Sequence, residues 1–284
     1  MHRLVVIGGP TASGKTALAI EWALKYNTEI LSADSRQCYR ELGIGVAKPS
    51  LEELHKVPHH FINSHSIHEE ISAADYEEYG LHCLTTLFQQ YETVVCVGGT
   101  GLYIKALCEG LDAMPSINKT IQLETEEQYH ALGLNWLQAQ LQQEDVAFFE
   151  SGDRNNPARL LRALIFKRST GKSILQYRTG QQKTRPFHID YFLLEPDRNT
   201  LYERINKRVD VMIQQGLVDE ARNLYPYRTL KNLQTVGYQE LFAHFNGECS
   251  LEESIDKIKQ HSRNYAKRQL TWFKNQGHFV KIIN

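Results

Sequence analysis

The sequence predicts an α/β protein with a P-loop-type parallel sheet flanked by helices and an all-helical insertion domain. Three observations lead to this fold. A buried strand runs into a glycine-rich loop near the N-terminus, apolar strands then alternate with amphipathic helices, and residues 112–186 carry helical patterns with few strand signals. We expect residues 1–111 and 187–284 to form the P-loop core, and residues 112–186 to form the insertion.

The composition is that of a globular protein. The 284 residues are 42% hydrophobic and 23% charged, and no apolar run approaches the ~20 residues needed to cross a bilayer. The N-terminal residues show no signal-peptide pattern, so we expect a cytoplasmic protein with no membrane partner. The five cysteines form no C-x-x-C pair, so we expect reduced thiols rather than disulfides or a zinc site.

The first strand, over residues 4–7, leads into the strongest motif. Residues 9–16 fit the phosphate-binding pattern G-x-x-x-x-G-K-[ST], and a helix is predicted directly after them. Backbone N–H groups of such a loop point at an anion, Lys15 adds a positive charge, and the Thr16 hydroxyl can bind Mg²⁺. A turn without a ligand fits the spacing and flanks poorly. The predicted polyphosphate-binding residues are Gly9, Pro10, Thr11, Ala12, Ser13, Gly14, Lys15 and Thr16.

The second strand, over residues 29–33, ends in Asp34-Ser35-Arg36-Gln37-Cys38-Tyr39. Because parallel strands end at one edge of a sheet, we expect this motif beside the phosphate-binding loop. Residues 43–49 and 57–61 predict loops. A helix is expected over residues 72–90, with Ser72 as its N-cap.

A third buried strand, over residues 93–97, ends in Gly98-Gly99-Thr100, and a helix follows to about Cys108. Hydrolytic P-loop ATPases often carry an aspartate at the end of such a strand. Glycine stands there in this sequence, which counts modestly against an ATPase.

The insertion carries an asymmetric charge although the whole chain has a net charge of only −1. Residues 109–153 contain nine acidic residues and one lysine, and residues 154–185 contain nine lysines and arginines without an acidic residue. This basic block fits a nucleic-acid phosphate surface and, equally, a solvated helix face. The predicted helices are 121–132, 135–141 and 157–168.

Strands and helices resume after the insertion. A strand is predicted over residues 187–194, and a last strand over residues 278–283. The helices between them are predicted at residues 199–215, 218–224 and 251–274.

Seven motifs together resemble those of the bacterial tRNA dimethylallyltransferases, also called isopentenyl-tRNA transferases. They are GPTASGKT, SADSRQCY, GVAKP, VPHH, VGGTGLYIKAL, QTVGYQEL and YAKRQLTWFK, and they extend to Lys274. The resemblance implies transfer of a dimethylallyl group from dimethylallyl diphosphate to N6 of adenosine 37, beside the anticodon. It also implies Mg²⁺ as cofactor and a helical insertion that grips the anticodon stem-loop. We expect a monomer.

The resemblance also implies roles for individual residues. Asp34 is the expected base for the N6 proton, which is worth ~10²–10⁴ in rate, although it could instead order water around Mg²⁺ or cap a helix. Thr100 is expected to contact the reacting adenine, although threonine is also a good helix N-cap. Arg208 is expected at the diphosphate, with a surface charge as the alternative. Cys38, His59 and His60 are assigned no catalytic or metal-binding role.

The resemblance implies a set of tRNA contacts on both parts of the chain. The expected residues are Asp34, Ser35, Arg36, Gln37, Thr100, Gln122, Ala158, Arg159, Leu160, Leu161 and Arg162. Gln122 stands where bacterial enzymes can carry an arginine, so this contact is either lost or made as a neutral hydrogen bond. Arg159 and Arg162 are three residues apart and share one helix face.

Three other functions compete with this one. A prenyltransferase for free AMP, ADP or ATP would need neither the insertion nor its basic block. A small-molecule P-loop kinase would leave the DSRQCY and GGT motifs unexplained. An RNA-binding module with a relict P-loop would not need the intact Gly14-Lys15-Thr16 and Asp34.

Overall fold

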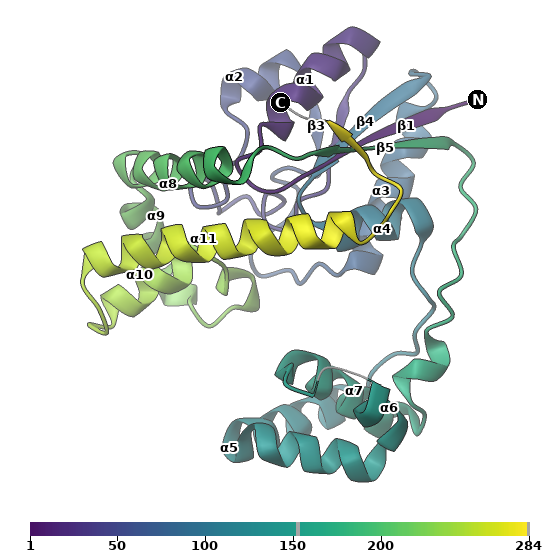
Figure 1. Cartoon of the computed structure of the whole chain (residues 1–284), viewed down its shortest axis with the longest axis vertical. Coiled ribbons are helices and arrows are strands. Elements are labelled where there is room, and N and C mark those ends of the chain that lie inside the picture. Colours follow the sequence, from purple (N-terminus) through teal and green to yellow (C-terminus); the bar gives the residue numbers. More distant parts are fainter. Residues whose placement is uncertain (152–153, 283–284) are drawn as a thin grey trace. The chain divides into compact units, whose positions relative to one another are not determined.

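The computed structural model describes residues 1–151 and 154–282 (Figure 1). The chain divides into two compact units. One combines Met1–Gly110 with the residues from Thr184 onward, and the other is Leu111–Lys183. We refer to them as the core unit and the helical unit.

The core unit contains a six-stranded, fully parallel sheet of order β3-β2-β4-β1-β5-β6. Because the strands are parallel, the loops after β1, β2 and β4 emerge at one edge. This confirms the expected α/β fold. The strands are β1 Arg3–Gly8, β2 Ile30–Ser32, β3 His59–His60, β4 Thr93–Gly98, β5 His188–Leu194 and β6 Val280–Ile282.

Alternate residues of β1 enter different hydrophobic clusters. Leu4 and Val6 belong to the large cluster, whereas Val5 and Ile7 pack in the cluster that contains α1 residues, and all four are fully buried. This is the alternation of side chains in a strand buried on both faces. The phosphate-binding loop therefore extends from a strand that is buried on both faces of the sheet.

Three helices of the core unit begin at serine caps. Ser50, Ser72 and Ser250 each form a capping box at the start of α2, α3 and α11. Helix α11 packs against α4, α8 and α10. The helices are α1 Lys15–Tyr26, α2 Leu51–Lys56, α3 Ala73–Leu87, α4 Gly101–Glu109, α8 Arg198–Gln214, α9 Leu217–Leu224, α10 Tyr238–Phe245 and α11 Leu251–Lys274.

The helical unit comprises α5 Lys119–Glu144, α6 Val146–Ser151 and α7 Pro157–Thr170, with a short 3₁₀ turn at Ile174–Tyr177. Helix α5 is interrupted at Gly133, whose φ of 75° and ψ of −167° are not helical. This explains why the sequence pattern indicates two helices there. The core of the helical unit is apolar and includes Leu137, Leu141, Leu160, Leu164 and Phe166.

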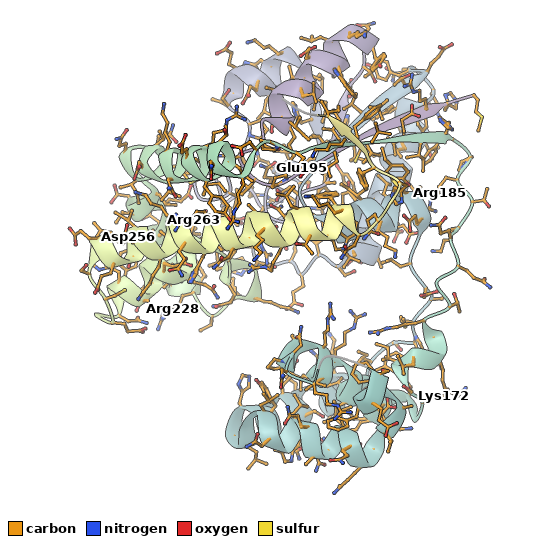
Figure 2. The ribbon with its side chains drawn as sticks, viewed as in Figure 1. Lys172, Arg185, Glu195, Arg228, Asp256 and Arg263 are labelled. Carbon is orange, nitrogen blue, oxygen red and sulfur yellow. The ribbon has the colours of Figure 1, made fainter. Side chains whose placement is uncertain are left out.

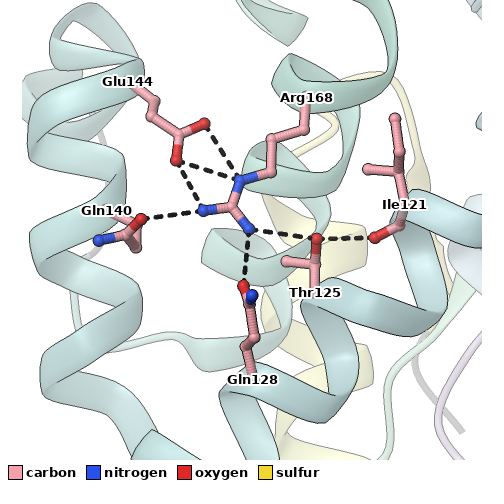
Figure 3. A network of polar contacts seen from close by, with 6 residues as sticks. All are labelled: Ile121, Thr125, Gln128, Gln140, Glu144 and Arg168. Atoms are coloured by element: carbon pink, nitrogen blue, oxygen red, sulfur yellow. Dashed lines mark hydrogen bonds and ion pairs between the residues drawn. The ribbon is translucent and has the colours of Figure 1, made fainter.

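Arg168 of the basic block is engaged inside the helical unit (Figure 3). Its guanidinium bonds Glu144 at 2.7 Å, Gln140 at 2.9 Å and Gln128 at 3.0 Å. The side chain joins α5 to α7 and is only 22% exposed. Arg168 therefore does not belong to an exposed phosphate-binding surface of the basic block, because its guanidinium is bonded to residues of the helical unit.

Arg185, labelled in Figure 2, is a second exception and belongs to the core unit. Its Nη2 donates to Glu77 Oε1 and to the Ala106 carbonyl, both at 2.8 Å, and its side chain is 8% exposed. This buried pair holds the chain against α3 and α4 where it re-enters the core unit.

Other differences from the predicted elements are small. Residues 57–61, expected as a loop, contribute the two-residue edge strand β3, and the helices α2, α6 and α10 were not predicted. The last strand ends at Ile282, and Ile283 lies outside the described residues. None of the helices within the described residues has the length and apolar character needed to span a bilayer.

Candidate functional site

The phosphate loop, residues 9–16, joins β1 to α1. Ala12 and Gly14 have φ of 62° and 92°, so the backbone turns in the left-handed region. Gly14 is the N-cap of α1 and offers no side-chain hydrogen bond, which leaves the first N–H groups of the helix for a ligand. The buried Ser13 Oγ also has no hydrogen-bond partner among the described residues. These features together make the loop a candidate anion site.

Lys15 supplies the charge of this anion site. Burial lowers the pKa of its ammonium group to about 8, with Asp34 opposing and Arg208 adding to the decrease. Its Nζ donates to the Pro10 carbonyl at 3.1 Å. A bound anion would stabilise the protonated form, because it would replace the lost solvation.

Arg208 of α8 reaches the same loop. Its Nη1 donates to Thr11 Oγ1 at 2.9 Å, and burial lowers the pKa of the guanidinium. Arg204, one turn earlier, lines a cavity of about 530 Å³ beside the loop together with Arg208. The structure thus places Arg208 at the phosphate loop rather than on an open surface.

The Asp34 motif forms a compact turn after β2. Asp34 Oδ1 accepts hydrogen bonds from the N–H groups of Arg36 at 2.9 Å and Gln37 at 3.3 Å. Gln37 Nε2 in turn donates to the carbonyls of Val46 and Ala47 at 3.2 and 2.9 Å. One carboxylate oxygen of Asp34 is therefore used to hold the turn.

Thr100 supports this turn from the loop after β4. Its Oγ1 accepts the Ser35 N–H at 3.0 Å and donates to Ser35 Oγ at 3.3 Å. Thr100 stands at the N-cap position of α4 but makes no side-chain cap. The hydroxyl is thus committed to the Asp34 motif and not to its own helix.

One cavity of about 640 Å³ in the core unit brings the predicted groups together. Lys15 and Thr16 meet the Asp34 motif there. Since the two motifs follow different strands of the same sheet, the parallel topology is what joins them. The residues of the prediction that line the cavity are Thr11, Ala12, Ser13, Gly14, Lys15, Thr16, Asp34, Ser35, Arg36, Gln37 and Arg208.

Helix α11 lines the cavity with five residues that the sequence reasoning did not assign: Ile258, Ser262, Tyr265, Arg268 and Gln269. Tyr265 lines the cavity, is 38% exposed, and has a pKa raised to about 12 by burial and then by the Asp34 charge. Gln269 lines it one turn later and is 7% exposed. The motif YAKRQLTWFK carried Tyr265 and Gln269, and their i, i+4 spacing was the available signal.

The Glu220 carboxylate connects the GVAKP and QTVGYQEL motifs through hydrogen bonds. The Glu220 carboxylate accepts the N–H groups of Gly43, Ile44 and Gly45 at 3.1, 2.8 and 2.9 Å. The Tyr238 hydroxyl donates to the same carboxylate at 2.6 Å. The loop at residues 43–47, which also accepts from Gln37, is thereby fixed at one wall of the cavity.

The predicted tRNA contacts of the insertion lie in the helical unit. Ala158, Arg159 and Arg162 are exposed on α7, whereas the Leu160 side chain is 2% exposed and packs inside the unit. Leu161 is partly buried. Gln122 Nε2 donates to Glu126 Oε1 at 2.9 Å, within α5. The exposed face of α7 is therefore arginine-rich, as the spacing predicted.

Cys38, His59 and His60 lie in or beside these motifs, and His59 also lines the cavity. Burial, followed by the Asp34 charge, raises the pKa of the Cys38 thiol to about 12. His60 Nε2 lies 2.6 Å from Glu29 Oε2, and His59 Nδ1 lies 2.7 Å from the Val57 carbonyl. Within residues 1–151 and 154–282, no cluster of three metal-binding side chains occurs.

Magnesium does not require such a cluster. Mg²⁺ commonly keeps its waters and binds through one or two protein groups and the phosphates of a substrate. Thr16 lines the cavity next to Lys15 and provides a hydroxyl oxygen of this kind. The site therefore fits Mg²⁺ that arrives with a polyphosphate.

These features define the class: an α/β P-loop protein in which the phosphate loop shares its cavity with an aspartate-bearing turn. Residues 37–276 match the model of the family described as IPP transferase. The chain belongs to the IPP transferase family.

Several similar proteins extend over nearly the whole chain. The tRNA dimethylallyltransferase 1 of Phocaeicola vulgatus is 45% identical over 98% of this chain and 92% of its own length. The tRNA dimethylallyltransferase of Cytophaga hutchinsonii is 44% identical over 95% and 89%.

Solved structures show the same fold. The full-length tRNA isopentenylpyrophosphate transferase of Bacillus halodurans is 35% identical with a TM-score of 0.74, over 100% of this chain and 90% of that one. A eukaryotic dimethylallyltransferase acting on tRNA is 25% identical with a TM-score of 0.82, over 100% and 74%.

Proposed function

We propose that the protein transfers a dimethylallyl group from dimethylallyl diphosphate to N6 of adenosine 37 in tRNA. The observation that carries this proposal is the single cavity that combines Lys15 and Thr16 with Asp34. Membership of the IPP transferase family supports it. The names of the relatives, tRNA dimethylallyltransferases, support the donor and the acceptor.

In this reaction the bond from the adenine N6 to the allyl carbon forms as the carbon–oxygen bond to the diphosphate breaks. Lys15, Arg208 and the loop N–H groups stabilise the negative charge that collects on the leaving diphosphate. Mg²⁺ held by Thr16 would neutralise part of the same charge. No phosphoryl group moves, so the loop serves a leaving group.

Asp34 is the proposed base. The exocyclic amine of adenine is a weak nucleophile because its lone pair is delocalised into the ring. A carboxylate that accepts the N6 proton during attack raises the rate by ~10²–10⁴. Since Oδ1 holds the turn through Arg36 and Gln37, Oδ2 is the oxygen we assign to the proton.

The tRNA requires contacts beyond the cavity. We assign phosphate contacts to Arg159 and Arg162, because both are exposed on one face of α7. Ser35 and Gln37 line the wall against which the adenine would lie, and Thr100 holds Ser35 in place. A base must leave its stack to reach Asp34. The helical unit is thus the proposed anticodon stem-loop grip, in a cytoplasmic monomer.

The test is a competition between acceptors. Purified protein receives Mg²⁺, dimethylallyl diphosphate, a tRNA with unmodified adenosine 37, and an equal concentration of AMP or ATP. We expect prenylated tRNA and no prenylated nucleotide. Equal turnover of the free nucleotide would assign the protein to the nucleotide prenyltransferases, and transfer of phosphate to any acceptor would make it a kinase.

A further inference from the structure

Gln269 of α11 reaches both loops that the proposed reaction must align. These are the phosphate loop and the β4 loop, residues 98–101. Gln269 Oε1 accepts the Thr11 N–H at 2.9 Å, and its Nε2 donates to the Gly99 carbonyl at 2.9 Å. Because the side chain is 7% exposed, little water competes for these two bonds.

The contact between α11 and the β4 loop is too close to admit a side chain at Gly99 or Gly101 of the loop. A Cβ at Gly99 would lie 2.3 Å from Gln269 Nε2, and a Cβ at Gly101 would lie 2.2 Å from the Trp272 ring. Gln269 and Trp272 are three residues apart on one helix face. The β4 loop is therefore seated directly on α11, and glycine at both positions permits this close packing.

The two loops carry the two sides of the reaction. The phosphate loop holds the donor through Lys15 and Thr16. The β4 loop holds the acceptor side, because Thr100 bonds the Ser35 N–H directly after Asp34. Attack at carbon requires the reacting atoms about 3–3.5 Å apart, so the spacing between these loops decides the rate.

We propose that Gln269 is a positioning residue that sets this spacing and couples the order of the β4 loop to occupancy of the phosphate loop. The proposal rests on the prenyl transfer proposed above. In this role Gln269 acts through the two loops and not on the reacting atoms. It keeps the donor within reach of the adenine amine through the two hydrogen bonds.

The first test separates rate from binding. Gln269→Met keeps the length of the side chain and removes both bonds. We expect the single-turnover rate to fall by about 10²-fold, with KM for tRNA and for dimethylallyl diphosphate within a few fold of the wild type. Gln269→Asn keeps a neutral amide that is one methylene too short to reach both loops, so it should bind pyrophosphate normally and react equally slowly.

The matched control is Gln276→Met. Among the described residues, the Gln276 side chain donates to the Trp272 carbonyl, four residues earlier, so its loss should leave the rate unchanged. If Gln269→Met does not fold, Gln269→Asn carries the same prediction. A single-turnover rate within twofold of the wild type in either variant, or a rate lost only through weaker binding, would overturn the proposal.

The second test needs no turnover. Hydrogen exchange is followed in the peptide covering residues 98–101, with and without pyrophosphate and Mg²⁺. We expect pyrophosphate to slow exchange there in the wild type and not in Gln269→Met. Equal protection in both proteins contradicts the coupling. If the wild type fails to prenylate tRNA, the proposed reaction is wrong, and this exchange difference still decides the role of Gln269.

Discussion

Replacement of Asp34 by asparagine tests the proposed base without dismantling its turn. Asparagine retains an oxygen at the position of Oδ1, so the N–H groups of Arg36 and Gln37 keep their acceptor. The variant therefore keeps the turn and loses the proton-accepting carboxylate, together with the negative charge that raises the pKa of Lys15. General-base catalysis is worth ~10²–10⁴ in rate. At about 1.36 kcal/mol per factor of ten, this is a barrier increase of about 3 to 5 kcal/mol.

The assay is single-turnover transfer from labelled dimethylallyl diphosphate to tRNA, with the protein in excess over tRNA. Asp34→Asn should bind tRNA as tightly as the wild type and react at least about a hundredfold more slowly. Asp34→Ala is the comparison that also removes the turn acceptor, so it should weaken tRNA binding as well. An unchanged rate in Asp34→Asn would refute the assignment of Asp34 as the base, because the amide of asparagine cannot accept the N6 proton.

Three further predictions follow from charges in the two units. Lys15 is protonated below its pKa of about 8 and neutral above it, so the affinity ratio of wild type to Lys15→Met for pyrophosphate should fall as the pH rises from 7 to 9. Calorimetry measures the two affinities, and the protonation of pyrophosphate itself cancels in their ratio. A ratio that stays constant with pH contradicts the assignment of Lys15 to the anion. Arg159→Ala with Arg162→Ala should reduce the slope of log affinity for tRNA against log salt by about 0.7–0.9 for each phosphate contact, with Lys119→Ala as control; an unaltered slope removes α7 from the tRNA surface. Arg168→Met should cost about 1–3 kcal/mol of unfolding free energy, because it leaves Glu144 and its neighbours unpaired, and leave the salt slope unchanged; thermal denaturation decides.

The sequence was sufficient for the parts of the site that rest on local pattern. The strand, glycine loop and helix at residues 4–24 could be predicted from the sequence. The glycine spacing and the Lys15-Thr16 pair that define this motif are adjacent in the chain and depend on no distant contact. The parallel sheet then places Asp34 beside the loop. For this reason the cavity could be expected before its geometry was known.

The contacts that the sequence did not reveal are those between distant residues. Gln269 bonds Thr11 and Gly99 across 258 and 170 positions, and no periodicity encodes such a pairing. Arg168 has the charge of a phosphate ligand, yet Glu144, 24 positions away, satisfies it. The edge strand β3 is only two residues long, so its alternation was too short to detect.

The most direct test of the account is the product balance of the purified protein with Mg²⁺, dimethylallyl diphosphate and tRNA. Mass spectrometry of the digested tRNA identifies the modified nucleoside and its position, and an enzymatic assay measures the diphosphate released. We predict one N6-dimethylallyl group at adenosine 37 for each diphosphate. Release of single phosphate groups, or a phosphorylated product with no prenylated adenosine, would contradict the assignment of the phosphate loop to a leaving diphosphate.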